Sequence, residues 1–461
     1  MTNNRIIKIL ILISVMFFSL ICYLTYIQIF QKDSLMASPY NKRQWDSEVG
    51  TVRGSIMDCD GVVLAETVDS VRVYPYNAMY SHIIGYNSKL YGRINLESAY
   101  NKELLGKNKF SELMGSSANE RGYDLKLTID HSIQEYAYRL LGNNNGCVIA
   151  IRPDDGRIIA MVSKPDFNPN DEQLMEDWGT LVENENSPFL ARATSGLYAP
   201  GSTFKMLTAL LAVENGYEDM IFKDEGSVEI GGHTFENQKE KAYGEIDLEQ
   251  GFAVSSNVAF CILGDKLGGE KLLNIAERFG FNKSINFDFN YSLSTFPEKI
   301  KGDEKEAALA IGQGEILATP LQMAMVTCGI ANRGVVMTPY IVDSIWNSEG
   351  DLIKKNSSKP LDKSADYLDT VKIVDMMVKT VKEGTASNAS IYGVDVAGKT
   401  GTAENEQTIL SKNKEHTWFV GFAPAYDPEI AVVVMMEYSG GTGGGNCAPI
   451  AGKIMKKYLN K

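Results

Sequence analysis

The segment YAPGSTFKMLTALLAV, residues 198–213, places Ser202 three residues before Lys205 and continues into an apolar run. Pro200 and Gly201 stand immediately before the serine, where a turn leading into a helix is expected. Residues three apart share a helix face, so the Lys205 amine is predicted to reach the Ser202 hydroxyl. The apolar run would desolvate the lysine, which favours its neutral form and prepares it to accept the serine proton.

The Ser-x-x-Lys spacing alone is weakly specific. It occurs again at Ser411–Lys414, in a charged segment that is typical of a solvated loop. Taken in isolation, GSTFK (201–205) favours a capping serine and a surface lysine over an activated nucleophile. Further motifs must decide between these two interpretations.

Two such motifs follow along the chain. Lys399–Thr402 reads KTGT at the end of the alternating stretch VDVAG, so lysine and hydroxyl groups flank a glycine that a peptide backbone could approach closely. Ser255–Asn257 reads SSN between apolar residues; a helix cap is the alternative, and Ser-x-Asn recurs at Ser117–Asn119 and Ser284–Asn286. In this order, Ser-x-x-Lys, Ser-x-Asn and Lys-Thr-Gly form the serine acyltransferase set, which favours Ser202 as a nucleophile.

The N-terminus carries a separate signal. Residues 9–30 contain no charged side chain over 22 residues, which corresponds to about 33 Å of helix against a bilayer core of roughly 30 Å. No clear small-x-small cleavage site follows closely, so a retained single-pass anchor is predicted rather than a signal peptide. Basic residues flank both ends, so the charge distribution leaves the orientation open.

Composition excludes some classes of function. The net charge of −13 argues against a nucleic-acid-binding protein, which needs a basic face. The six cysteines are scattered and the four histidines lie far apart, with no metal-ligand spacing. We therefore expect neither a metal nor a cofactor.

The pattern of strands and helices predicts an α+β fold. Residues 146–163 form two β-rich runs around RPDDG, and a hairpin is also predicted at 53–68, with its turn at Asp58–Gly61. Residues 125–141 predict a short strand, an N-cap at Asp130 and an amphipathic helix. The C-terminal part predicts strands within 395–404 and 416–439 and then a helix, whereas 170–390 is mostly helical pattern and loop. Two strands before and three after a helical middle predict one sheet built from both ends of the domain.

The chain resembles class B penicillin-binding proteins, which are membrane-anchored peptidoglycan transpeptidases. RGSIMDCDGVVLA (53–65) is similar to the family motif Arg-Gly-x-Ile-x-Asp-Arg-x-Gly-x-x-Leu-Ala, with Cys59 in place of the second arginine. Four other stretches match family landmarks: LTIDHSIQ (127–134), GQGEILATPLQMA (312–324), GTA (384–386) and TWFVGFAP (417–424). The resemblance covers nearly the whole chain.

This resemblance implies a transpeptidase fold related to serine β-lactamases, with a five-stranded, mainly antiparallel sheet covered by helices. The implied division is a cytoplasmic tail at 1–8, a transmembrane helix at 9–30, a short non-catalytic region at 31–125 and the transpeptidase domain at 126–461. The non-catalytic region is too short for the glycosyltransferase domain of class A proteins. Its length also argues against an elaborate pedestal or dimerisation module.

The resemblance also implies roles for the motif residues. Ser202 would attack the D-Ala-D-Ala amide with Lys205 as the base, and Ser255 would relay a proton to the leaving amine. Asn257 would hold the substrate amide and contact Lys205. The KTGT residues would bind the substrate carboxylate and align its backbone: Lys399, Thr400, Gly401 and Thr402. The backbone N–H groups of Ser202 and Thr402 would form the oxyanion hole.

The implied partners are peptidoglycan stem peptides on a lipid-linked precursor, β-lactam antibiotics, and a polytopic glycosyltransferase of shape, division or sporulation. Because stem peptides lie outside the cytoplasm, the catalytic domain is expected there too. A membrane-tethered β-lactamase, a β-lactam sensor and a catalytically silent scaffold are the alternatives. The N-terminal motifs argue against the first. The single span, with no effector domain before it, argues against the second.

Overall fold

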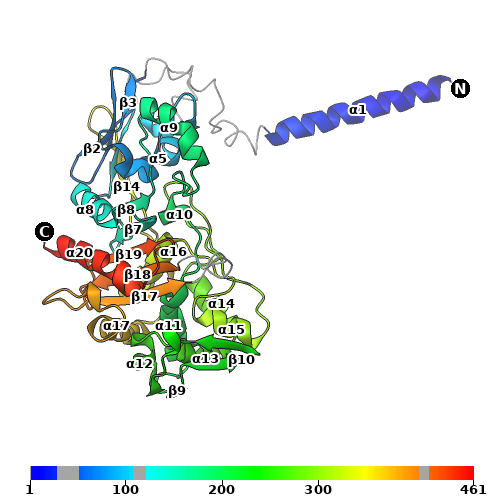
Figure 1. Ribbon diagram of the computed structural model, residues 1–461. Helices are drawn as coiled ribbons and strands as arrows, with labels where there is room; N and C mark the ends of the chain where they lie inside the picture. The colour runs from blue at the N-terminus through cyan, green and yellow to red at the C-terminus, as the bar shows by residue number, and fades with distance from the viewer. Residues whose placement is uncertain (1, 28–50, 107–120, 404–414, 461) are drawn as a thin grey trace.

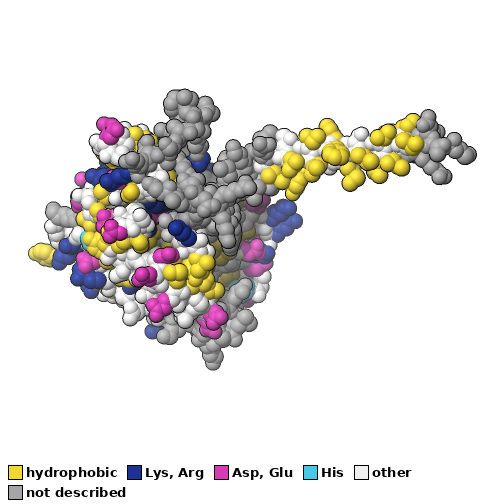
Figure 2. Space-filling model, turned by 90° about the horizontal axis from the view of Figure 1, so that it is seen from above, with side chains coloured by type: hydrophobic (Ala, Val, Ile, Leu, Met, Phe, Trp, Pro, Cys, Tyr) yellow, Lys and Arg dark blue, Asp and Glu magenta, His cyan; other side chains and the backbone are white. Residues whose placement is uncertain are grey.

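The computed structural model describes residues 2–27, 51–106, 121–403 and 415–460. Helix α1 (Thr2–Tyr26) extends away from the rest of the chain, and its apolar side chains are exposed (Figures 1 and 2). Residues 6–26 form one stretch that is long and apolar enough to cross a membrane. The predicted span starts at Ile9, but the helix begins seven residues earlier, at Thr2. It therefore includes the charged residues Arg5 and Lys8. Residues 28–30 of the predicted span, Ser411–Lys414 and Ser117–Asn119 lie outside the described residues.

The central sheet has five antiparallel strands in the order β17-β18-β19-β7-β8. As predicted, two strands come from the start of the domain and three from its end: β7 (Gly146–Ile151), β8 (Ile158–Lys164), β17 (Ala397–Ala403), β18 (His416–Ala423) and β19 (Ile430–Met436). Every residue of β7, β18 and β19 is buried. Their apolar runs are therefore continuous, because both faces of the sheet are covered.

Alternate residues of these strands enter two different cores. Ile149 and Ile151 belong to one cluster with α11 and α16, while Val148 and Ala150 join α8 and α20 on the opposite face. This follows from the two-residue period of a strand. The two faces are covered by α11 (Lys205–Glu214) and α16 (Pro320–Ala331) on one side, and by α8 (His131–Leu141) and α20 (Ala448–Leu459) on the other.

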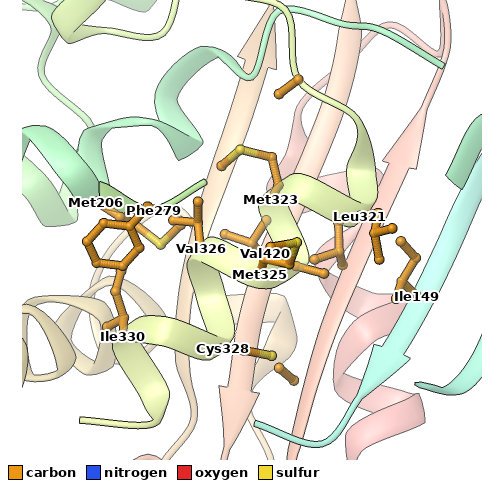
Figure 3. Close-up of a cluster of buried hydrophobic side chains, with 14 of the residues drawn as sticks. Ile149, Met206, Phe279, Leu321, Met323, Met325, Val326, Cys328, Ile330 and Val420 are labelled. Atoms are coloured by element: carbon orange, nitrogen blue, oxygen red, sulfur yellow. The ribbon is translucent and has the colours of Figure 1, made fainter. Parts of the chain in front are cut away.

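Helix α16 forms the centre of the first core, and all of its residues are buried. Figure 3 shows Leu321 beside Ile149 of the sheet, while Ile330 lies near Met206 and Phe279. Met206 is the second residue of α11, directly after Lys205. The segment that carries the predicted nucleophile is thus backed by a close-packed core rather than by a surface loop.

The N-terminal region forms a second sheet, in the order β15-β14-β6-β1-β2-β3. The predicted hairpin at 53–68 is confirmed, since β1 and β2 pair antiparallel across Asp58–Gly61. The prediction that 170–390 is mostly helical pattern and loop misses β14 and β15: β14 pairs with β6 on one side and with β15 on the other. The strands are β1 (Ile56–Met57), β2 (Val63–Val68), β3 (Val71–Val73), β6 (Asp124–Leu127), β14 (Val342–Trp346) and β15 (Leu352–Lys355). The predicted cap is confirmed: Asp130 accepts a hydrogen bond from the Ile133 N–H at the start of α8.

A buried ion cluster holds this region together. The Glu97 carboxylate is fully buried and lies 2.6 Å from Arg53 Nε and 2.7 Å from Arg72 Nε. Tyr74 donates a further hydrogen bond to it, at 3.2 Å. Burial opposes ionisation, but the two arginines prevail and lower the pKa of Glu97 to about 2. The arginine that opens the family-like motif therefore has a structural role here.

Replacing Glu97 with glutamine should lower the free energy of unfolding by about 3–5 kcal/mol, because it leaves two arginine charges buried without a counter-charge. Urea denaturation of both proteins at pH 7 measures the difference. The difference should shrink as the pH falls from about 4.5 towards about 2, since protonation of Glu97 removes the same charge. Glu135→Gln is the matched control, because the Glu135–Arg139 pair is exposed; it should cost less than about 0.5 kcal/mol. Equal effects would contradict the assignment.

Candidate active site

The predicted nucleophile lies in a tight turn against the edge strand β17. Ser202 is half-buried in the 3-10 turn η3 (Gly201–Thr203), and α11 begins at Lys205. Gly201 has a φ of +52°, and a Cβ there would lie 2.8 Å from the Thr402 carbonyl oxygen. The Gly201 N–H donates to the Gly312 carbonyl at 2.9 Å. Glycine at 201 therefore permits the close approach that puts the backbones of Ser202 and Thr402 side by side.

The second motif spans the junction of α12 (Leu248–Ala253) and α13 (Asn257–Leu267). The helix-cap interpretation of SSN is confirmed for Ser256, whereas the active-site roles of Ser255 and Asn257 stay predictions. The Ser256 hydroxyl caps α13 by accepting from the Ala259 N–H at 3.0 Å. Ser255 and Asn257 remain half-buried, and Ser255 adopts a φ of +62°, which is uncommon for a residue with a side chain. Such backbone strain is characteristic of functional sites.

Both motif lysines are fully buried and converge on this segment. Lys205 Nζ donates to Asn257 Oδ1 at 2.8 Å, to the Ser255 carbonyl at 2.9 Å and to the Ser256 carbonyl at 3.2 Å. Lys399 Nζ donates to Ser255 Oγ at 2.8 Å. The Ser255 hydroxyl therefore lies between the two amines, and the structure brings together Lys205, Ser255, Asn257 and Lys399.

Burial changes the charge of both amines. It lowers the pKa of Lys205 to about 7, against weaker opposing effects of Cys261 and Asp224. Burial also lowers the pKa of Lys399 well below its ordinary value, and repulsion from Lys205 lowers it further. A substantial fraction of Lys205 is therefore neutral near pH 7, as a general base requires.

The relation between Ser202 and Lys205 differs from the prediction in one respect. Among the described residues, Lys205 Nζ makes its hydrogen bonds to the 255–257 segment and none to Ser202 Oγ. Ser202 belongs to the 3-10 turn rather than to α11, so the two residues do not share one regular helical face. Hydrogen bonds between a nucleophile and its base often tighten only when substrate binds, so Lys205 stays the predicted base.

Strand β17 carries the third motif beside the turn that holds Ser202. Thr402 is half-buried, whereas Thr400 is only 6% exposed and its Oγ1 lies 2.6 Å from Thr385 Oγ1. Gly401 lies against the nucleophile turn, because a Cβ there would be 3.0 Å from Thr203 Cγ2 and 3.1 Å from the Pro200 carbonyl oxygen. GTA (384–386) matched a family landmark in the sequence, but no role was predicted for Thr385.

Two other residues of the site were missed. Asp224 and Asn237 are buried and hydrogen-bonded to Ser256 and to the Asn257 N–H, respectively. Both lie in polar stretches that look solvated in the sequence, 33 and 20 residues before Asn257, respectively. No spacing rule connects them to the Ser-x-Asn motif, so only the structure identifies them.

Comparison with known proteins places the chain in a family. The family model "Penicillin binding protein transpeptidase domain" matches residues 146–456. The peptidoglycan D,D-transpeptidase PbpA of Mycolicibacterium smegmatis is 31% identical over 97% of each chain. Stage V sporulation protein D of Bacillus subtilis is 32% identical over 87% of this chain and 66% of its own length. The chain belongs to the penicillin-binding protein transpeptidase family, which confirms the resemblance.

Solved structures agree with this assignment. The D,D-transpeptidase domain of a peptidoglycan glycosyltransferase from Eggerthella lenta is 36% identical with a TM-score of 0.81, covering 89% of this chain and 99% of that one. Penicillin-binding protein A of Mycobacterium tuberculosis, solved as its penicillin G acyl-enzyme, is 29% identical with a TM-score of 0.82, covering 89% of this chain and 100% of that one. The predicted fold is confirmed.

One expectation for the N-terminal region is wrong. Its short length argued against a dimerisation module, but the family model "Penicillin binding protein A dimerisation domain" matches residues 53–120. The matched segment begins at Arg53, the residue that contacts Glu97. Length was a poor guide here because β14 and β15, more than 200 residues further along the chain, complete this region's sheet.

Acylation should depend on pH through Lys205. With a pKa of about 7, the neutral fraction of its amine rises about tenfold between pH 6 and pH 8. The second-order rate constant for acylation by benzylpenicillin, measured by rapid quench and intact mass, should rise by a similar factor. The side chain in Lys205→Arg stays protonated throughout this pH range. Its acylation rate constant should therefore be about 10²–10⁴-fold lower. A flat profile in the wild-type protein would contradict a titrating Lys205 base.

Gly401→Ala should slow acylation, because the added Cβ forces the nucleophile turn away from β17. A displacement of about 1 Å at a reacting group costs up to about 10²-fold in rate. Gly179→Ala is the matched control, since a Cβ at Gly179 meets nothing within 4 Å. The same benzylpenicillin assay on both variants, with circular dichroism to verify folding, checks the prediction. Equal rates would show that the approach of turn and strand is not required.

Proposed function

We propose that the chain cross-links peptidoglycan as a D,D-transpeptidase with Ser202 as its nucleophile. One observation carries the proposal: two fully buried lysines from separate motifs meet at the Ser255 hydroxyl, beside the turn that holds Ser202. Burying two charged amines is costly, so burial favours the neutral form of both lysines. An acyl-transfer site that needs both a base and a proton relay uses that form.

The first half of the reaction forms an acyl-enzyme. Ser202 Oγ attacks the carbonyl carbon of the D-Ala-D-Ala amide while its proton passes to neutral Lys205 Nζ. The backbone N–H groups of Ser202 and Thr402 stabilise the negative oxygen of the tetrahedral intermediate, and losing one such donor typically costs about 10²–10³-fold. The C–N bond then breaks, and the terminal D-Ala leaves with a proton relayed through Ser255.

The other motif residues hold the substrate. Lys399 and the hydroxyl of Thr402 bind the terminal carboxylate. Thr400 also contributes to this binding, and its hydroxyl is held by a hydrogen bond with Thr385. The Asn257 amide holds the donor peptide while its Oδ1 keeps Lys205 in place. Gly401 leaves the strand open to a peptide backbone. These groups align the scissile bond with Ser202.

In the second half, an amine from a neighbouring stem peptide attacks the acyl carbon. It loses its proton to the Lys205–Ser255 pair, Ser202 is released, and the new amide is the cross-link. A β-lactam takes the same first step, but its opened ring remains tethered and blocks the acceptor. The same site therefore accounts for both synthesis and inhibition.

The proposal extends to location and partners. Helix α1 serves as a single membrane anchor, with residues 1–8 in the cytoplasm and the catalytic domain outside, where stem peptides on lipid-linked precursors lie. Residues 31–125 form the non-catalytic region and 126–461 the transpeptidase domain. Cross-linking acts on glycan strands made by a polymerase, so a polytopic glycosyltransferase is the proposed partner.

The full chain, in detergent, should form one covalent benzylpenicillin adduct. Intact mass spectrometry should show the mass of the drug added to the protein, and peptide mapping should place it on Ser202. Ser202→Ala should give no adduct. The adduct should persist for many minutes, because a transpeptidase excludes water from its acyl-enzyme more effectively than a β-lactamase does.

Other results of the benzylpenicillin experiment would distinguish the transpeptidase from the alternative functions. Rapid turnover of the drug, with only transient adduct, would establish the tethered β-lactamase instead. No adduct on wild-type protein shown to be folded by circular dichroism would contradict the acylating site. Ser284→Ala is the matched control, because Ser284 opens the other described Ser-x-Asn triplet and should acylate as the wild type does.

A further inference from the structure

A buried carboxylate lies directly behind the Ser-x-Asn motif. Asp224, at the end of β9 (Phe222–Asp224), is 0% exposed and forms no ion pair with any described residue. Its oxygens accept from Ser256 Oγ at 2.6 Å, from Asn237 Nδ2 at 2.8 and 2.9 Å, and from the Gly226 N–H at 2.9 Å. Burying a carboxylate without a paired cation is costly even when it is hydrogen-bonded. A neutral residue would serve as a simple structural anchor at less cost.

Asn237 transmits this anchor to the motif. It follows β11 (His233–Glu236), and its Oδ1 accepts from the Asn257 N–H at 2.7 Å and the Val258 N–H at 3.3 Å. The neighbouring Glu236 carbonyl accepts from Asn257 Nδ2 at 2.7 Å. Both the backbone and the side chain of Asn257 are therefore held from this side. The opposite side of the Asn257 amide, its Oδ1, holds Lys205.

We propose that Asp224 and Asn237 are positioning residues for acyl transfer: they fix the 255–257 segment that holds Lys205, and the Asp224 charge tunes that lysine. This inference rests on the proposed function of Ser202 and Lys205. Neither residue touches the substrate. They act through Ser256 and Asn257, whose oxygens are acceptors for the Lys205 amine.

The charge of Asp224 has a defined direction of effect. Burial lowers the pKa of Lys205, and Asp224 partly opposes that effect by favouring the ammonium form. Without the Asp224 charge, Lys205 would stay neutral to lower pH. The other groups that favour or disfavour its proton are Cys261 and Lys399, on α13 and β17. A neutral residue at position 224 would lack this electrostatic effect.

The test compares Asp224→Asn, Asn237→Ala and wild-type protein, each as the full chain, by the rate of benzylpenicillin acylation between pH 5 and pH 9. Both variants should acylate more slowly at pH 8, by about 10- to 100-fold, because the lysine and Asn257 lose their alignment. In Asp224→Asn, the pH at which the rate falls to half should move lower. In Asn237→Ala, which keeps the charge, it should stay near the wild-type value.

Asp247→Ala is the matched control, because alanine cannot accept the capping hydrogen bond. Asp247 also caps a helix of this region, α12, by accepting from the Gln250 N–H at 2.7 Å, but it does not contact residues 255–257. It should lower the melting temperature and leave both the rate and the pH profile unchanged. This control separates the loss of a helix cap from the loss of positioning.

Three outcomes would overturn the proposal. Folded Asp224→Asn with a wild-type rate and profile would refute it. A slowed Asp224→Asn whose profile is unmoved would reduce Asp224 to a structural anchor. If Asp224→Asn fails to fold, the acylation rate of Asn237→Ala tests the proposal. A wild-type rate in Asn237→Ala would refute the positioning role of both residues. Failure of the proposed function is distinguishable, because wild-type protein would then form no adduct on Ser202 at all.

Discussion

The structure depends on one constraint: two lysine side chains must be buried together without leaving their amines unsatisfied. Lys205 of α11 and Lys399 of β17 are both fully buried and share the Ser255 hydroxyl. Burial favours neutral amines, and neutral amines keep the need for hydrogen-bond acceptors. The 255–257 segment supplies those acceptors, and the left-handed backbone of Ser255 places its carbonyl and hydroxyl towards the two lysines.

Several features of the fold could be predicted because they follow from short-range patterns. The apolar runs at 146–151 and 430–436 are continuous, which is typical of strands buried on both faces, and turn residues separate them from their neighbours. Motif order then identified Ser202, Lys205 and Lys399 together, although each motif alone was ambiguous. The ambiguity of SSN was genuine, since Ser256 caps a helix while its neighbours face the lysines.

Other features depend on tertiary contacts and left no local pattern. Strand β15 is exposed at every residue, so its sequence lacks the alternation that marks a half-buried strand. Asp224 is a carboxylate in a charged stretch, and nothing in that stretch shows that it is buried. Thr385 meets Thr400 only because the end of α17 (Tyr367–Lys382) lies against β17. Such residues can be identified only once the fold is known, and the sequence motifs indicate which fold to expect.

Direct titration of Lys205 tests the account most closely. Protein labelled with lysine carrying carbon-13 at Cε, at full length and in detergent, would be followed by NMR from pH 5 to pH 11. One signal, absent from Lys205→Arg, should titrate near pH 7, where burial places the pKa of Lys205. Titration of that signal near the ordinary lysine value of 10.5 would contradict the account, because Lys205 would then be protonated whenever the site must act as a base.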